Sequence, residues 1–184
     1  MTRQPTPAIE LARREDLPSI LALSNWAAAH TSANFATEPE PLAEWVASWE
    51  SSSAMYPWLV ARAGDEVFGF AKASPHRARG AYAWTAEVSV YVDPARHRSG
   101  VARALYGRLL PLLRAQGYVT LLAGIVDGHD ASERLHAAFG FRRVGVFERV
   151  GWKRGAWHGV SYWQLELDPS GAPPTSITPV AQHF

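Results

Sequence analysis

The 184-residue chain contains no cysteine, and this absence removes several classes of site at once. Without thiols there can be no disulfide framework, no thiolate metal site and no cysteine nucleophile. Absence of disulfides is typical of a reducing compartment, so we expect the protein to be cytoplasmic.

A strong charge imbalance and long apolar runs are also missing. The 18 basic and 17 acidic side chains give no reason to expect nucleic acid or an anionic membrane as the main partner. No apolar run approaches the roughly 18 residues that a membrane-spanning helix needs, and residues 1–10 lack the apolar stretch of a secretory signal. We therefore expect a soluble protein that binds a small molecule, with no membrane and no nucleic acid as partner.

Apolar residues, in contrast, are plentiful. They make up 47% of the chain, enough for one substantial core, and eight Trp and seven Phe must line a core, a pocket or an interface. We predict a single domain over residues 1–167. Proline and serine are frequent after that point, so residues 168–184 are expected to form a tail.

The spacing of apolar residues predicts the element order β-αα-βββ-α-β-α-ββ, an α/β (α+β) fold with a mixed sheet and helices on its faces. Asp16 is expected to cap the first helix, which ends around Thr31. Gly64 and Asp65 are expected to form a hairpin turn. The strands are expected at residues 9–12, 58–63, 67–73, 82–92, 119–125, 142–149 and 161–167, and the later helices at 41–51, 100–117 and 131–139.

A basic turn that contains glycine joins the strand at 82–92 to the helix at 100–117. It reads Asp93-Pro94-Ala95-Arg96-His97-Arg98-Ser99-Gly100. Such a turn directs free N–H groups and the positive end of the helix dipole at one spot, which favours a phosphate or pyrophosphate. The local chemistry fits an ordinary turn with solvated arginines equally well, because neither G-x-x-x-x-G-K-[ST] nor G-x-G-x-x-G is present.

Glu87 lies in the otherwise apolar and aromatic strand that precedes this turn. A carboxylate in such a strand costs free energy unless it is paired or functional. We expect Glu87 to be buried, which raises proton affinity and suits a carboxylate to act as a general base. The alternative is a glutamate on the solvent face of the strand.

Several sequence blocks match a known family. Its pyrophosphate motif, Gln or Arg followed by x-x-Gly-x and then Gly or Ala, corresponds to residues 97–102, with His97 in the first position. The other blocks are Asn34-Phe35-x-Thr37-Glu38-Pro39, Tyr56-Pro57-Trp58-Leu59-Val60, Ala81-Tyr82-x-Trp84-Thr85-Ala86-Glu87, Val90-Tyr91-Val92, Arg134-Leu135-His136, Gly151-x-Lys153-x-Gly155-x-Trp157-His158 and Trp163-Gln164. On these blocks the chain resembles the GNAT superfamily of acetyl-CoA-dependent N-acyltransferases, and within it the phosphinothricin N-acetyltransferase branch.

The resemblance implies the GNAT fold, a mixed and mostly antiparallel sheet that is splayed between two parallel strands, with helices on both faces. It implies acetyl-CoA as cosubstrate and no metal. Backbone groups of Val90, Tyr91 and Val92 would pair with the pantetheine arm, and an amide there would stabilise the oxyanion. The other residues that the resemblance assigns to the cofactor are Arg98, Ser99, Gly100, Val101, Ala102, Arg103, His129 and Ser132.

Two catalytic roles follow from the same resemblance. Glu87 would remove the proton from the substrate ammonium, directly or through water. His136 would lie near the thioester sulfur, as an acid to the leaving thiolate or as a second base, since histidine titrates near neutral pH. The alternative for His136 is a structural histidine satisfied by helix packing.

The resemblance also implies the acceptor site. Arg79 and Tyr82 match positions for carboxylate and phosphinyl recognition, for which an arginine fork is suited, and Asn34 and Phe35 would form the opposing wall. A solvated loop arginine is the alternative for Arg79. The acceptor would be a small amino acid or analogue such as phosphinothricin, methionine sulfoximine or methionine sulfone.

Relatives in the family are homodimers, so we expect a homodimer with Lys153, Trp157 and His158 at the subunit interface. Two positions depart from the family pattern: His129 replaces an asparagine, and Gly159 replaces an acid. Two other functions stay open. One is acetylation of a peptide N-terminus or a polyamine, and the other is a non-catalytic acyl-CoA-binding sensor, against which the presence of Glu87 argues.

Overall fold

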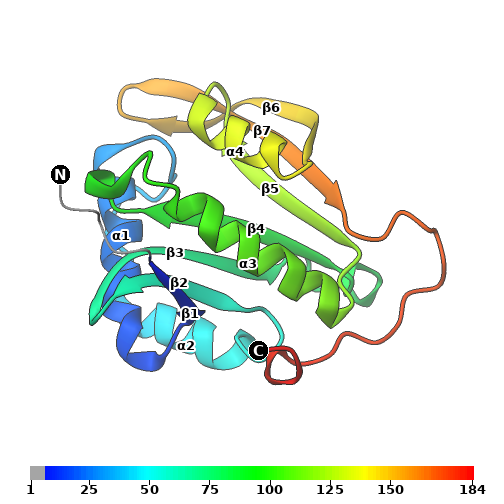
Figure 1. Ribbon diagram of the computed structural model, residues 1–184. Coiled ribbons are helices and arrows are strands. Elements are labelled where there is room, and N and C mark those ends of the chain that lie inside the picture. Colours follow the sequence, from blue (N-terminus) through cyan, green and yellow to red (C-terminus); the bar gives the residue numbers. More distant parts are fainter. Residues whose placement is uncertain (1–6) are drawn as a thin grey trace.

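A seven-stranded sheet in the order β1-β2-β3-β4-β5-β7-β6 runs through the computed structural model, which describes residues 7–184 (Figure 1). Neighbouring strands are antiparallel, except for β4 and β5, which are parallel. The predicted mixed, mostly antiparallel sheet is therefore confirmed. The strands are β1 (Ala8–Leu11), β2 (Trp58–Ala63), β3 (Glu66–Pro75), β4 (Thr85–Val92), β5 (Thr120–Val126), β6 (Arg142–Lys153) and β7 (Ala156–Glu166).

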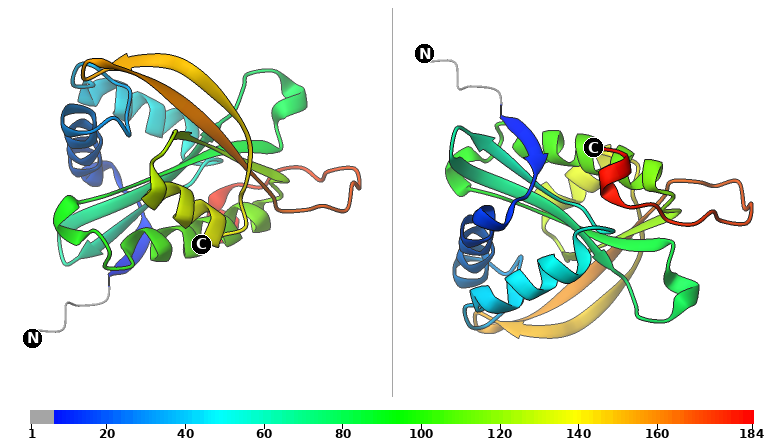
Figure 2. Two further views of the ribbon diagram at one scale, coloured as in Figure 1. Left: turned by 90° about the horizontal axis from the view of Figure 1, so that it is seen from above. Right: turned by 90° about the horizontal axis from the view of Figure 1, so that it is seen from below.

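Four α-helices cover the two faces of this sheet. Helices α1 (Leu17–His30) and α2 (Leu42–Ser52) lie on one face, and α3 (Val101–Gln116) and α4 (Asp130–Ala138) lie on the other (Figure 2). Short 3-10 turns are η1 (Arg14–Asp16), η2 (Gly80–Tyr82), η3 (Pro94–Arg96) and η4 (Val180–Gln182).

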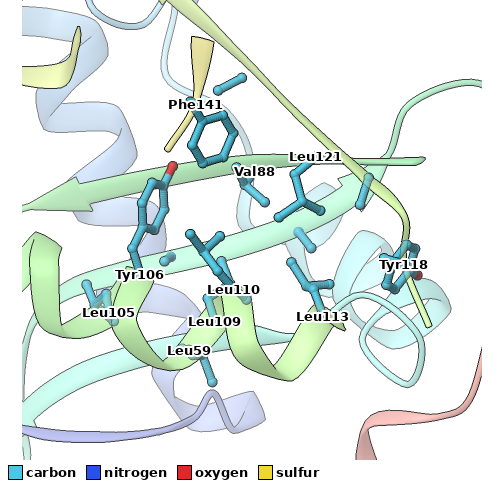
Figure 3. Close-up of a cluster of buried hydrophobic side chains, with 14 of the residues drawn as sticks. Leu59, Val88, Leu105, Tyr106, Leu109, Leu110, Leu113, Tyr118, Leu121 and Phe141 are labelled. Carbon is cyan, nitrogen blue, oxygen red and sulfur yellow. The ribbon is translucent and has the colours of Figure 1, made fainter. Parts of the chain in front are cut away.

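Each face has its own hydrophobic core. Under α3, fully buried leucines at helical spacing, Leu105, Leu109 and Leu113, pack on Val88 and Leu121 of the sheet (Figure 3). Under α1 and α2 a second cluster contains Leu17, Ile20, Trp45, Trp58, Val60 and Phe70. The strands between them are buried from both sides, which explains their nearly continuous apolar runs.

Alternation along β4 sends its side chains to the two faces in turn. Ala86 and Val88 belong to the core under α3, whereas Tyr91 stacks on Phe70 of the other core with 5.2 Å between ring centroids. Because successive side chains in a strand point to opposite faces, Glu87 lies on the same face as Tyr91, the face of α1 and α2.

Some element boundaries differ from the predictions. Strand β4 begins at Thr85 rather than at residue 82, because residues 80–82 form the turn η2. The last two strands form one long hairpin, whose turn consists of Arg154 (φ 52°) and Gly155 (φ 75°). Two adjacent left-handed residues match the twist of the strands they connect.

Asp16 does not cap α1. Its own backbone is helical, with φ −82° and ψ −19°, so its side chain does not reach over the first N–H groups of the helix. The carboxylate, 3% exposed, instead accepts a hydrogen bond from the Arg13 N–H at 2.9 Å and forms an ion pair with Arg62 of β2. This contact ties the start of α1 to the sheet.

Residues 168–184 run from β7 back across the end of the domain toward α2 and α3 (Figure 1). The side-chain amide of Gln116 donates to the carbonyls of Met55 and Thr178, both at 2.9 Å, and the Thr178 N–H donates to the Gln116 carbonyl at 2.9 Å. Val180 is 4% exposed. The hydrogen bonds of Gln116 with Thr178 and the buried Val180 therefore hold this predicted tail against the domain.

Candidate active site

The parallel pairing of β4 with β5 extends over only three residue pairs. These are Thr85 with Thr120, Ala86 with Leu121 and Glu87 with Leu122. Beyond Glu87 the strands diverge, although β4 stays paired with β3 to Val92 and β5 with β7 to Val126. The two facing strand edges therefore carry backbone N–H and C=O groups with no ladder partner, so they can pair with a ligand.

A pocket of about 600 Å³ opens at this divergence. Its walls come from both faces of the sheet: α1 and the loop after it on one side, and the N-terminus of α3 and helix α4 on the other. Among the predicted site residues, those that line it are Val90, Tyr91, Val92, Arg98, Gly100, Val101, Ala102, Arg103, His129, Ser132 and His136.

The N-terminus of α3 presents free N–H groups to this pocket. Arg98 (φ 61°) and Gly100 (φ 87°) are left-handed, and no side chain caps the helix. The first helical bond runs from the Ala104 N–H to the Gly100 carbonyl at 2.9 Å, so the N–H groups of residues 101–103 have no partner within the helix. With the arginines beside it, this end of α3 is suited to bind a phosphate.

Two predicted members of this turn have other contacts. The Ser99 hydroxyl donates to the Arg96 carbonyl at 2.5 Å, and Ser99 does not line the pocket. The ring of His97 donates from Nε2 to the Val92 carbonyl at 3.1 Å. The histidine that departs from the family motif therefore ties the turn to the end of β4.

His136 is buried in the wall of the pocket, with 3% of its surface exposed. Its Nδ1 donates to the Ser132 carbonyl at 2.8 Å, so Nε2, at 3.0 Å, accepts a hydrogen bond from the Tyr106 hydroxyl. Burial lowers the pKa of His136, and the neutral ring matches this pattern. Both ring nitrogens are therefore engaged within the protein.

The sequence did not identify Tyr106 as a site residue, because its position in α3 fits the apolar stripe of the helix. It is fully buried, and burial raises the pKa of its hydroxyl. Figure 3 shows the ring reaching from α3 toward Phe141, whose ring lies 5.1 Å from that of His136. Only the packing of α4 on α3 reveals that this tyrosine is the partner of His136.

Glu87 is not buried as expected. Its side chain is 45% exposed, because its neighbours Ala86 and Val88 are the residues that α3 covers and Glu87 points the other way. The carboxylate is paired with His76, with 2.7 Å between Oε1 and Nδ1. Glu87 does not line the pocket itself, but Val88 and Ser89, the next residues along β4, do.

His76 is a second residue that the sequence did not single out. It follows Pro75, the last residue of β3, and the register that pairs Ser74 with Glu87 brings it to the carboxylate. The Tyr82 ring lies edge-on to the imidazole, with 5.4 Å between centroids. Arg79 is exposed and makes no side-chain hydrogen bond or ion pair within residues 7–184.

Asn34 and Phe35 lie in the loop after α1, close to the β6–β7 hairpin. The Asn34 side chain donates to the Ser24 hydroxyl at 3.1 Å, and the backbone carbonyl of Asn34 accepts from the ammonium group of Lys153. Lys153 also donates to the Ala28 carbonyl at 2.6 Å. The hairpin is thus fastened to the C-terminal end of α1, which fixes the loop between them.

These contacts correct the expected interface role of Lys153. Its side chain is buried inside the chain because it satisfies carbonyl groups at the end of α1. His158 also has contacts within the chain, since its Nε2 lies 3.0 Å from the Lys153 carbonyl and 3.3 Å from the Ser32 hydroxyl. Trp157, in contrast, is 57% exposed.

Metal-ligand clusters and membrane-spanning helices do not occur in the described part of the chain. Within residues 7–184, no group of three or more His, Cys, Asp or Glu side chains is placed to hold a metal ion. The same residues include no helix with the length and apolar character needed to cross a membrane.

Comparison with known proteins gives one consistent result. The sequence model of the acetyltransferase (GNAT) domain family matches residues 9–159. A phosphinothricin N-acetyltransferase of Streptomyces viridochromogenes is 38% identical over 174 residues, which cover 95% of this chain and 94% of the relative. An L-methionine sulfoximine/L-methionine sulfone acetyltransferase of Salmonella typhimurium is 33% identical over 90% of this chain and 97% of its own.

Solved structures agree with these sequences. A GNAT superfamily phosphinothricin acetyltransferase from Sinorhizobium meliloti, crystallised in complex with acetyl-CoA, superimposes with a TM-score of 0.88. It is 29% identical, and the match covers 93% of this chain and 94% of that one.

The close approach of Gly151 to Phe35 provides a test of how this wall of the site is built. A Cβ at Gly151 would lie 2.4 Å from Cε2 of the Phe35 ring, so we expect Gly151→Ala to displace the ring and to destabilise the fold by about 1–3 kcal/mol. Gly145 lies in the same strand, and a Cβ added there would have no atom within 4 Å, so Gly145→Ala is the matched control. Urea unfolding measures both; equal stability of the two variants would contradict the packing described.

Proposed function

The chain belongs to the GNAT acetyltransferases, and from that premise we propose that it transfers the acetyl group of acetyl-CoA to the α-amino group of a small amino acid or analogue. Acceptors of the phosphinothricin, methionine sulfoximine and methionine sulfone type are supported by the names of relatives at 38% and 33% identity. The observation that carries the proposal is the pocket at the divergence of β4 and β5, which reaches residues on both faces of the sheet.

In this proposal the N-terminus of α3 holds the pyrophosphate of acetyl-CoA. The free N–H groups of Val101, Ala102 and Arg103 are the donors, and Arg98 supplies positive charge without a fixed ion pair among the described residues. The pantetheine arm would lie along the open edge of β4 at residues 90–92 and pair with its backbone. This arrangement would bring the thioester to the divergence point, beside Ser89.

The chemistry is a direct attack within a ternary complex. Glu87 is the carboxylate on which removal of the ammonium proton depends, directly or through a water molecule. The neutral amine then attacks the thioester carbonyl, a backbone N–H of β4 stabilises the oxyanion, and the thiolate leaves with the carbon–sulfur bond electrons. Holding both reactants in one pocket supplies the proximity.

His136 is proposed to act at the sulfur side of the pocket through Tyr106. A neutral imidazole has one N–H, and that of His136 is given to Ser132. Its second nitrogen orients the Tyr106 hydroxyl, and both residues line the same pocket. The loop residues Asn34 and Phe35, with Tyr82 beside His76, are proposed to surround the acceptor.

Two other functions are less well supported. Acetylation of a peptide N-terminus or a polyamine would call for an acidic or peptide-shaped groove in place of Arg79 and Tyr82. A non-catalytic acyl-CoA sensor would have no use for the paired carboxylate at Glu87. A cytoplasmic location and the absence of nucleic-acid and membrane partners stay predictions.

Turnover of acetyl-CoA with a panel of acceptors tests the activity. We expect release of free CoA with phosphinothricin, methionine sulfoximine or methionine sulfone, and a fall of roughly 10²–10⁴-fold in kcat/KM for Glu87→Gln. Glu15→Gln changes an exposed glutamate in the turn η1, which does not line the pocket, and is the control. Turnover with peptides or polyamines alone would favour the first rival, and tight acetyl-CoA binding without turnover would favour the sensor.

Backbone geometry at Gly100 tests the pyrophosphate site. Valine does not tolerate φ 87°, so Gly100→Val should distort the turn and raise the Kd for acetyl-CoA at least about tenfold. Gly64→Val imposes similar strain at φ 58° in the β2–β3 turn, remote from the pocket, and should leave this Kd unchanged. Isothermal titration measures both; an unchanged Kd for Gly100→Val would count against the site.

The expected homodimer belongs to the same proposal. The β6–β7 hairpin lies at the edge of the sheet and exposes five large apolar side chains, between 46% and 59% exposed. A concentration of apolar surface on an edge hairpin is typical of a protein interface. These residues are Val144, Phe147, Val150, Trp152 and Trp157.

Sedimentation equilibrium tests this interface. We expect a dimer for the wild-type chain, and Phe147→Glu should raise the dimer dissociation constant at least about tenfold because it places a charge in an apolar interface. Leu42→Glu changes a 40% exposed leucine on α2 and should leave the dimer intact. A wild-type chain that stays monomeric at micromolar concentration would refute the proposal.

A further inference from the structure

The hydrogen bond between Glu87 and His76 has a defined direction, from the imidazole to the carboxylate. An ionised carboxylate can only accept, so the 2.7 Å contact means that Nδ1 of His76 carries a hydrogen and donates it to Oε1 of Glu87. In the neutral ring, Nε2 then carries the lone pair. Within residues 7–184 this nitrogen has no hydrogen-bond partner, and 18% of the side chain is exposed.

The imidazole of His76 lies among side chains from β4, η2 and its own loop. Three groups lie on the elements packed around it: Glu87 on β4, Tyr82 in η2 and Arg77, the next residue along. The guanidinium of Arg77 lies 5.7 Å from the centre of the Tyr82 ring. Glu87 is thus the charged group in hydrogen-bond contact with the imidazole.

A carboxylate that accepts from Nδ1–H, with Nε2 free, is the arrangement that makes histidine a general base. The carboxylate fixes the tautomer and orientation of the ring and stabilises the charge that develops when Nε2 takes up a proton. Besides the family resemblance, burial was the physical reason for expecting Glu87 to act as a base on its own, and that burial is absent.

On the basis of the proposed function, we propose that His76 is a catalytic residue whose Nε2 receives the proton of the acceptor ammonium, while Glu87 positions the ring. In this step the N–H bond of the ammonium breaks and its electron pair stays on nitrogen, which becomes the neutral nucleophile. His76 becomes an imidazolium paired with Glu87. It returns the proton to water through the exposed part of its side chain.

The pH profile of the reaction tests this assignment. A base whose lone pair must accept the proton is inactive once it is already protonated, so kcat/KM of the wild-type enzyme should fall at acidic pH. His76→Gln should lower kcat/KM about 10²-fold or more and remove this acidic limb, with the Kd for acetyl-CoA unchanged. Glutamine can still donate to Glu87, so a merely structural role would be restored by this variant.

Chemical rescue gives a second, independent readout. Imidazole added to His76→Ala should restore part of the activity, and it should not restore Glu87→Gln, which retains His76 but has lost the carboxylate. His183→Gln, which changes a histidine near the C-terminus, is the matched control and should keep the wild-type rate and pH profile.

Two results would overturn the assignment. One is a His76→Gln enzyme with the wild-type rate and the same acidic limb, since Glu87 would then act alone. The other uses the wild-type enzyme alone, so it applies even where the variants do not fold. The pH at which kcat/KM falls on the acidic side should shift strongly with temperature, because ionisation of imidazole does. If this pH did not change with temperature, the titrating group would be a carboxylate. Failure of the proposed function itself differs from both, because the wild-type enzyme would then acetylate no amino acid.

Discussion

The site depends on how soon β4 and β5 stop pairing. Their ladder has three residue pairs and ends at Glu87 and Leu122, while each strand stays bonded to its outer neighbour. A sheet with fixed outer ladders cannot close such a gap, so the facing edges keep unpaired backbone groups in the middle of the fold. Leaving these groups without partners costs free energy, and an extended ligand that pairs with them relieves that cost.

The same divergence determines which groups meet. Because β4 leads through a short turn into α3, the free N–H groups of that helix lie at one end of the gap, and the paired carboxylate Glu87 lies at the other. Alternation along β4 then separates the roles, since Glu87 faces α1 and α2 while its neighbours are packed under α3. An acetyl donor bound at α3 and an amine bound at the opposite face of the sheet can therefore meet only where β4 and β5 diverge.

The sequence was sufficient for features that depend on local pattern. Element order and the glycine at the start of α3 follow from spacing and backbone preference. Features that depend on register or packing were not accessible. His76 reaches Glu87 only through the pairing of β3 with β4, and Tyr106 resembled one more apolar residue of its helix. The sequence analysis named the exposure of Glu87 only as the alternative to burial, because an apolar strand does not reveal which face is open.

His136, in the wall of the pocket, and His76, beside Glu87, differ in a way that their residue type cannot reveal. His136 is buried, its pKa is lowered, and both of its nitrogens are occupied by Ser132 and Tyr106. His76 has one nitrogen held by a carboxylate and the other free within the described part of the chain. A general base needs a lone pair that is open to the substrate and a partner that stabilises the resulting charge. By that criterion His136 is suited to orient a hydroxyl group, and the proton of the acceptor belongs on the side of the sheet where His76 and Glu87 meet.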